Sequence, residues 1–305
     1  MEATTTITSK LEMIVTEQSA EQIPEPYHGM KVSEDDYWAF YYDYPDRCFE
    51  WCEGKLEELG VSDLLTLRVY KWFLFLLQAY LDSFPVAEII NLETGFRLRN
   101  RSIRKPDLGV IHQDNPVQMK GLDKSYSGIF DMCIEALSDS TPEDEERDTI
   151  RKYQEYAAAM VKEYYILHDS LARCAFYRLG INKKYVPIDD SDGIIRSTVL
   201  PGFQFRLMDL VKKPPLIKLI HDPAYQHFVM LDYQKALREK NEAVQEKDAA
   251  VQEKNEAVQE KNEAVQEKDA AILREQAAVL KAEYERQRAE AAEAELARLK
   301  ALLVK

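Results

Sequence analysis

The spacing of hydrophobic and polar positions changes along the chain and divides it into three parts. Residues 1–30 are rich in Thr, Glu and Pro and offer little that a core could bury. Residues 31–230 carry all three Trp and most of the other aromatic residues. From residue 231 onward Gly and Pro are absent, and Ala, Glu, Lys and Gln dominate. The pattern predicts a loose N-terminal arm (1–30), a folded domain (31–230) and a helical tail (231–305).

Within the folded domain, the apolar segment 64–84 repeats with a spacing near 3.6 residues and predicts a buried helix that ends before Pro85. Thr141, followed by Pro142 and several acidic residues, predicts the start of a second helix that runs to about Met160. Short apolar segments between these helices predict strands. The mixture predicts an α/β fold in which helices flank a mixed central sheet. The strands are expected at 86–91, 96–99, 108–112, 131–137, 163–168, 173–179, 185–188 and 197–205.

The tail contains a seven-residue repeat. The unit NEAVQEK begins at Asn241 and recurs up to residue 268, once in the form DAAVQEK. One apolar position in each unit keeps the same phase, and a helix can hold such a stripe against a partner by supercoiling. The repeat predicts a coiled coil through which the chain self-associates, and a single solvated helix is the alternative. The apolar positions are Leu237, Val244, Val251, Val258, Val265, Ile272 and Val279.

Composition and charge exclude several classes of protein. The 40 basic and 54 acidic residues give a net charge of -14, which excludes a polybasic protein that attracts nucleic acid over its whole surface. No signal-peptide pattern opens the chain, and no apolar run of roughly 20 residues predicts a membrane span. Four cysteines are too few for a disulfide scaffold, and Gly-rich loops that bind nucleotide phosphates are absent. A cytoplasmic protein is expected.

Two carboxylates occupy unusual places in the predicted sheet. Asp107 follows Pro106 and opens a strand, and Glu135 lies within the apolar strand 131–137. A carboxylate in an apolar strand must be solvated, paired or bound to a metal, because burying it alone is costly. Two of them on adjacent strands would form an oxygen-rich site of the kind that Mg²⁺ prefers. An ion pair or a strand-end cap is the alternative.

Six short segments follow one another along the predicted domain. They are FEWCEGK (49–55), RKPDL (104–108), IEALS (134–138), Asp148 with Lys152 and Tyr156, EYYIL (163–167) and STVLPGF (197–203). In this order they resemble the Uma-type restriction endonuclease family of the PD-(D/E)XK nuclease superfamily, over roughly residues 32–210. The resemblance implies a restriction-endonuclease-like core with a mixed central sheet flanked by helices.

The resemblance also implies a function, which is Mg²⁺-dependent hydrolysis of DNA, with Mn²⁺ as a possible substitute. Asp107 and Glu135 would hold the metal, and Glu50 would be a further ligand. The superfamily's lysine normally lies two residues after the strand glutamate, where this chain has Leu137. Lys152 on the following helix would take its place and act with Asp107 and Glu135 in catalysis. An ordinary surface pair with Asp148 is the alternative for Lys152.

Five basic residues cluster just before Asp107 in an otherwise acidic domain. Alternation would place three of them on one face of a strand, where they could grip the phosphates of DNA. A solvated hairpin edge is the alternative. The cluster consists of Arg97, Arg99, Arg101, Arg104 and Lys105.

Some features depart from the family pattern. The acidic run at 143–146 would repel DNA if it faced the cleft, and residues 61–67 lack the histidine that is common near the start of the first long helix. These departures leave a second hypothesis open. The chain would then be a catalytically inactive module that binds nucleic acid or assembles with itself.

Overall fold

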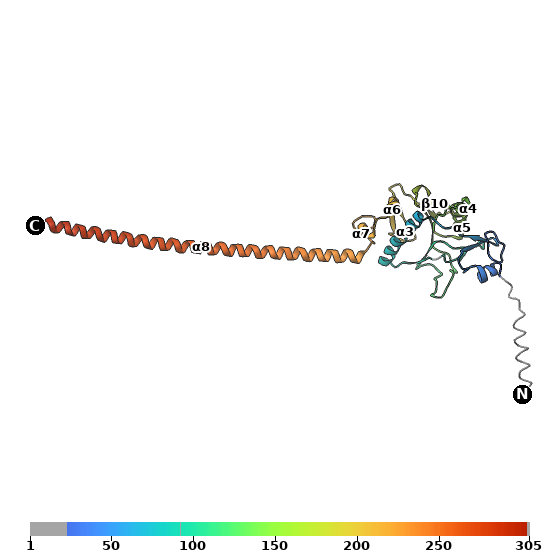
Figure 1. The fold of residues 1–305 in the computed structure, drawn as a ribbon, viewed down its shortest axis with the longest axis horizontal. Coiled ribbons are helices and arrows are strands. Elements are labelled where there is room, and N and C mark those ends of the chain that lie inside the picture. Colours follow the sequence, from blue (N-terminus) through green and yellow to red (C-terminus); the bar gives the residue numbers. More distant parts are fainter. Residues whose placement is uncertain (1–22, 92, 304–305) are drawn as a thin grey trace, which may run out of the picture. The chain divides into compact units, whose positions relative to one another are not determined.

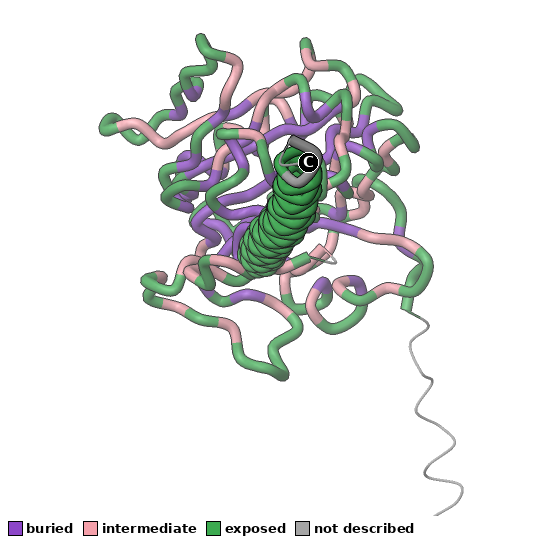
Figure 2. Tube along the Cα trace, turned by 90° about the vertical axis from the view of Figure 1, so that its left-hand side faces the viewer, coloured by how far each residue is buried: buried purple, intermediate pink, exposed green. Residues whose placement is uncertain are grey.

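The computed structural model of the protein describes residues 23–91 and 93–303 (Figure 1). Most of the predicted N-terminal arm therefore lies outside the described residues. The chain divides into two compact units that meet at Leu231, and each unit is described by itself. Buried positions gather in the first unit, whereas the tail is exposed almost throughout (Figure 2).

A six-stranded mixed sheet forms the centre of the first unit, with the strand order β10-β9-β8-β7-β6-β3. β7 and β8 run parallel, and the other four neighbouring pairs are antiparallel. This arrangement confirms the predicted α/β fold with a mixed central sheet. The strands are β3 (Ala87–Ile90), β6 (Leu108–His112), β7 (Met132–Ala136), β8 (Glu163–Leu167), β9 (Ala175–Leu179) and β10 (Tyr185–Pro187).

The long helix α3 (Leu64–Ser83) covers one face of this sheet. The carboxylate of Asp63 caps it by accepting hydrogen bonds from the backbone N–H groups of Leu65 and Thr66, and the helix ends shortly before Pro85, as predicted. By length and composition alone α3 could span a membrane. Its apolar side is instead buried against the sheet, as in the core helix of a folded domain.

The second predicted helix is present but is not regular throughout. It consists of α4 (Pro142–Glu146), a π-helical turn η2 (Arg147–Arg151) and α5 (Lys152–Ala159). Thr141 caps its start by accepting a hydrogen bond from the N–H of Asp144. The sequence predicted the helix and its cap but not the wider turn. Such turns inside helices occur frequently at functional sites.

A second sheet, with the order β2-β1-β5-β4, lies on the N-terminal side of the fold and was not predicted as a sheet. Its outer face packs Phe49 and Trp51 against Tyr37 and Tyr41, which lie in the π-helical turn η1 that follows the short helix α2 (Glu34–Asp36). The strands and this turn are η1 (Tyr37–Tyr41), β1 (Phe49–Cys52), β2 (Lys55–Glu58), β4 (Phe96–Arg97) and β5 (Ile103–Arg104).

Two predicted strands are shorter or broken. β4 ends at Arg97, and the chain then turns into β5 instead of continuing to residue 99. The predicted strand at 197–205 is wrong, because a turn through Pro201 and Gly202 separates two short strands that pair with each other. Gly202 has a φ of +93°, which a glycine adopts readily. The remaining elements are η3 (Leu171–Arg173), β11 (Ile194–Arg196), β12 (Gln204–Arg206), α6 (Leu207–Lys212) and α7 (Leu216–Leu219).

The tail is one unbroken helix, α8 (Leu231–Leu303), of 73 residues. At a rise of 1.5 Å per residue its length is about 110 Å.

Candidate active site

Charged side chains fill the interface between the four-stranded sheet and the helix at 142–159. Side chains alternate along a strand, so Phe49 and Trp51 face the outer core while Glu50, between them, faces the helix. Removing a charge from water is costly, so every buried charge here needs a partner. We call this group the ionic layer, and its members are Glu50, Arg104, Arg147, Asp148 and Lys152, all buried.

The two candidate carboxylates lie beside this layer on adjacent strands. The antiparallel register pairs Leu108 of β6 with Ile134 of β7, and its continuation places Asp107 opposite Glu135. Asp107 Oδ2 accepts a hydrogen bond of 2.6 Å from the backbone N–H of Ala136, which holds its carboxylate against β7. The predicted strand positions therefore bring the two acids to one place.

Lys152 reaches the same place from the helix. Its Nζ lies 3.0 Å from Glu135 Oε2, 3.3 Å from Glu50 Oε1 and 3.4 Å from Asp148 Oδ1. The hydroxyl of Tyr156, one turn later, donates a hydrogen bond of 2.8 Å to Glu135 Oε1. The spacing of 148, 152 and 156 does put three side chains on one buried face, so Lys152 is not part of an exposed surface pair.

The position where the superfamily normally has its lysine is apolar in this chain, and Lys152 of the helix at 142–159 supplies the ammonium group instead. Leu137 lies two residues after Glu135, and its side chain is buried in an apolar cluster with Tyr156 and Tyr164. A lysine there would replace part of that cluster. Lys152 places its ammonium group beside Glu135 and leaves the apolar cluster intact.

The pKa values of the buried carboxylates are shifted in opposite directions, because their surroundings carry different amounts of positive charge. Burial opposes ionisation of Glu50, but the positive charges of Lys152 and Arg104 outweigh it and lower the pKa of Glu50 to about 2. Burial raises the pKa of Asp107 to about 6. Burial also raises the pKa of Glu135 above its ordinary range, and the charge of Asp107 adds to the effect. The positive charge near Asp107 and Glu135 is thus too small to offset the cost of burying their ionised carboxylates.

A small cavity of about 30 Å³ joins these groups. This volume is sufficient for a single water or ion. Carboxylate oxygens with uncompensated charge form a donor set that fits a divalent cation such as Mg²⁺. The lining residues are Leu59, Gly60, Ser62, Glu93, Lys105, Asp107, Glu135, Ala136, Ser138, Arg147, Asp148 and Lys152.

Glu50 occupies a different place from the one expected of a metal ligand. Its Oε2 accepts a hydrogen bond of 2.8 Å from Arg104, and its Oε1 accepts one of 2.7 Å from the backbone N–H of Lys105. It does not line the small cavity. Because both oxygens are engaged by protein donors, the geometry favours a positioning role, in which Glu50 holds Lys152.

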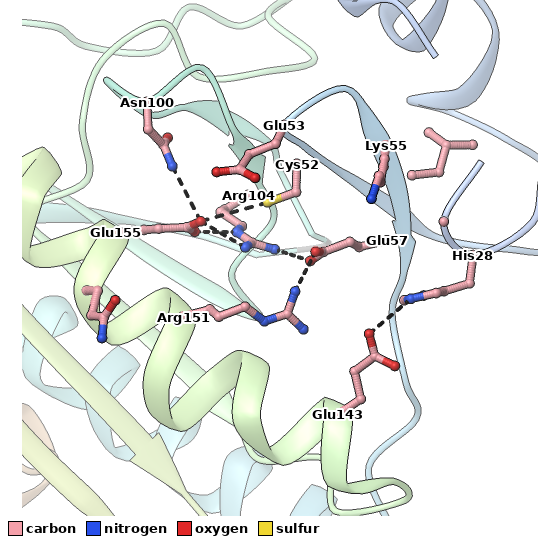
Figure 3. A pocket seen from close by; sticks show the side chains of 13 residues that line it. His28, Cys52, Glu53, Lys55, Glu57, Asn100, Arg104, Glu143, Arg151 and Glu155 are labelled. Carbon is pink, nitrogen blue, oxygen red and sulfur yellow. Dashed lines mark hydrogen bonds and ion pairs between the residues drawn. The ribbon is translucent and has the colours of Figure 1, made fainter. Parts of the chain in front are cut away.

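Arg104 connects the ionic layer to a second, larger cavity of about 550 Å³ (Figure 3). In this view the guanidinium of Arg104 lies between Glu155 and Glu57, and Arg151 also pairs with Glu57. The side chain of Arg104 is fully buried. Its charge is met by Glu50, Glu57 and Glu155, so it cannot grip an external phosphate in this arrangement.

The remaining basic residues of the predicted strip differ in exposure. Arg97, Arg99 and Arg101 are exposed on the β4–β5 hairpin, and Arg97 pairs with Glu34 at 2.7 Å. Lys105 is buried and donates from Nζ to the backbone oxygen of Tyr42. The strip is therefore a hairpin with three exposed arginines, while Lys105 and Arg104 are internal.

Two of the four carboxylates in the acidic run at 143–146 pair with arginines. Asp144 pairs with Arg147 at 2.8 Å, and Glu145 pairs with Arg173 at 2.9 Å. Glu143 lies 3.2 Å from the imidazole of His28. These contacts weaken the electrostatic objection to DNA that the sequence raised.

Two charged members of the site, Glu93 and Arg147, escaped the sequence analysis. Glu93 lies in the loop after β3 with a φ of +54°, and it lines the small cavity. Arg147 stands in the π-helical turn and contacts Asp148 at 3.2 Å. The left-handed backbone at Glu93 has no signal in the sequence. Arg147 precedes the Asp148–Lys152–Tyr156 motif directly, which is a signal that could have been used.

A further group of metal-ligating side chains lies at the ends of β7 and β8. Ligand atoms of Asp63, Asp139 and His168 come within 4.8 Å of one another. Asp63 caps α3, however, and Asp139 is engaged by Arg173. These groups already have partners within the protein.

Comparison with known proteins gives three findings. No curated protein matches the chain. A solved structure described as "a putative nuclease belonging to DUF820", from Anabaena variabilis, is similar, with a TM-score of 0.48 and 12% identity. The similarity covers 59% of this chain and 97% of that one. The model of the Uma2 family, described as "putative restriction endonuclease", matches residues 35–209, which is more than half of the chain. The chain therefore belongs to the Uma2 family.

Proposed function

We propose that this protein is a metal-dependent endonuclease that hydrolyses phosphodiester bonds of DNA. The observation that carries the proposal is the convergence of Asp107, Glu135 and Lys152 on one small cavity. Membership of a family described as "putative restriction endonuclease" supports it. An inactive module would leave these three side chains free to point apart.

Asp107 and Glu135 would hold Mg²⁺, or Mn²⁺ in its place. A bound divalent cation polarises a phosphoryl oxygen, lowers the pKa of a bound water and stabilises the leaving oxygen. Asp107 is oriented for this task by the N–H of Ala136, and Glu135 by the hydroxyl of Tyr156. Both carboxylates must be ionised to bind the metal, so protons compete with it.

Lys152 would act as a fixed positive charge. Burial opposes its charge, but the carboxylates of Glu135 and Glu50 outweigh burial and raise the pKa of Lys152. The ammonium therefore stays protonated in this site. Its position suits stabilisation of negative charge that develops on the phosphate in the transition state.

The exposed arginines of the β4–β5 hairpin are the proposed contacts to DNA phosphates. Arg99 and Arg101 are exposed near the tip, and Arg97 lies on β4. Each phosphate that an arginine neutralises releases counterions, so binding should weaken as salt increases. Replacing Arg99 and Arg101 by Ala should reduce the slope of log affinity against log salt by about 1 for each arginine that binds a phosphate.

The test is cleavage of supercoiled plasmid by the purified protein with Mg²⁺ or Mn²⁺, compared with Asp107→Ala, Glu135→Ala and Lys152→Ala. Nicking or linearisation that is lost in all three variants and kept in Asp190→Ala, on an exposed loop, supports the proposal. DNA binding without cleavage by the wild type under either metal overturns it. That result would support the alternative of an inactive nucleic-acid-binding module.

A further inference from the structure

Helix α8 carries a stripe of exposed aliphatic residues. Between 49% and 55% of each residue's surface is accessible, and the values are nearly equal along about 50 Å of helix. Single exposed aliphatic residues are normal on a protein surface, but a row with a strict seven-residue period is the pattern by which helices pair. The stripe consists of Val244, Val251, Val258, Val265, Ile272 and Val279.

The period of the stripe identifies the kind of partner. An ideal α-helix drifts by about 20° for each seven residues, so a strict heptad stripe winds around a straight helix. Five steps separate Val244 from Val279, which amounts to about 100° of drift. Only a partner that supercoils with α8 keeps the whole stripe covered, and a helix with the same seven-residue period does so.

The chain itself supplies such a helix. With the aliphatic residues at heptad position d, position a is held by Asn241, Asn255 and Asn262, by Asp248 in the variant unit, and by Asp269 in the heptad that follows the repeats. Asn at position a favours two strands and pairs with the same residue of its copy, which selects the register. A second copy of the chain is therefore a fitting occupant.

Charge at the flanking positions selects the orientation. Every repeat unit has Lys at position g, as in Lys247, Lys254 and Lys261, and Gln at position e. A parallel pair places position g of one helix beside position e of the other, so Lys faces Gln. An antiparallel pair places position g beside position g, so lysines of the repeat units at 241–268 would face one another, which is repulsive. In the parallel pair, Lys247 also lies next to position a of its partner, where Asp248 needs a positive neighbour.

We propose that α8 binds a second copy of itself, parallel and in register, as a two-stranded coiled coil. The first unit precedes α8 in each chain, so a parallel pair tethers both nuclease-like units to the same end of the coil. Two sites held together suit the two strands of a duplex. The proposal does not depend on cleavage, because it concerns the association of the chains.

The first test measures the mass of the full chain in solution by light scattering after gel filtration. The wild type should have the mass of a dimer at micromolar concentration. Val258→Lys with Val265→Lys should give a monomer, because both changes place charge in the seam. The control Glu260→Lys with Glu267→Lys puts the same lysines on the outer face (position f) and should remain a dimer. A wild-type monomer or trimer overturns the proposal.

The second test measures orientation through disulfide formation. Val244→Cys and Val279→Cys are made separately and oxidised, with Glu260→Cys as the outer-face control. A parallel pair in register should form a covalent dimer at both positions, whereas an antiparallel pair can do so at one position at most. Cross-linking only when the two variants are mixed would overturn the parallel arrangement. Circular dichroism of each variant checks that α8 stays helical.

Discussion

The two faces of the six-stranded sheet are covered in opposite ways. On one face, α3 buries apolar side chains, and Phe73 makes ring contacts with Tyr165, Phe203 and Phe205 at centroid distances of 5.3–6.2 Å. On the other face, the helix at 142–159 packs Tyr156 and Ala157 in its second half. Its first half instead contributes Arg147 and Asp148 to the ionic layer.

The apolar face of the sheet thus contributes mainly to stability, and the charged face carries the candidate site. Apolar contacts are additive in area and tolerate exchanges of similar volume. Buried ions are different, because removal of one partner leaves a charge without either water or a counter-charge. The ionic layer therefore fixes the position of Lys152, and substitution of any of its members should be strongly destabilising. Substitutions in the ionic layer should therefore have larger effects on stability than substitutions on the apolar face.

The largest effect is expected for Arg104→Met. This change leaves Glu50 with only part of its positive surroundings and leaves Glu57 and Glu155 facing each other without their shared cation. We expect a loss of about 3–5 kcal/mol in the free energy of unfolding, measured with urea. Arg99→Met, on the exposed hairpin, is the matched control and should change stability by less than about 0.5 kcal/mol.

A companion variant sharpens this prediction. Glu50→Gln in the Arg104→Met background removes a buried charge that has lost one of its cations, so part of the stability should return. Equal unfolding midpoints for the wild type and Arg104→Met would show that the ionic layer does not contribute to stability.

A smaller effect is expected from pH. The pKa of Asp107 is raised to about 6 in the folded protein. Between about pH 4 and 6 the folded state keeps a proton that the unfolded state releases, so stability falls as pH rises. Asp107→Asn removes this slope and should be more stable than the wild type at pH 7 by about 3 kcal/mol in EDTA.

Magnesium should reverse the sign of this difference. Because the metal binds the ionised carboxylate, Mg²⁺ should stabilise the wild type at pH 7 and leave Asp107→Asn almost unchanged. Thermal unfolding with and without Mg²⁺ measures this. An equal shift in both proteins would exclude Asp107 as a ligand.

The smallest effect is expected on the apolar face. Phe73→Leu keeps an apolar side chain of reduced volume, so the free energy of unfolding should fall by about 1–1.5 kcal/mol. Plasmid cleavage should not change, since the site lies on the other face of the sheet. A loss of cleavage without a loss of stability would show that the two faces are coupled.

Much of the fold could be predicted because its signals are local. The period of 64–84, the cap at Thr141 and the apolar strand segments each depend on neighbours in sequence. The meeting of Asp107, Glu135 and Lys152 also follows from short-range rules. Adjacent strands bring the two acids together, and one helical turn separates Asp148 from Lys152.

The parts that could not be predicted depend on distant partners. Arg104 and Lys105 read as an exposed basic cluster, but Arg104 is buried because Glu57 and Glu155, about 50 residues away on either side, meet its charge. Charged residues that alternate along a strand predict a solvated face. Here a second charged surface, the helix at 142–159, covers that face instead.

The repeats of α8 have a consequence for the evolution of this chain. Three units, which begin at Asn241, Asn255 and Asn262, are identical, so unequal recombination between their coding sequences can delete or duplicate whole units. Each event changes the helix by seven residues, or about 10.5 Å, and preserves the phase of every valine. The tail of this lineage can therefore vary in length by discrete steps while the folded unit before it remains the same.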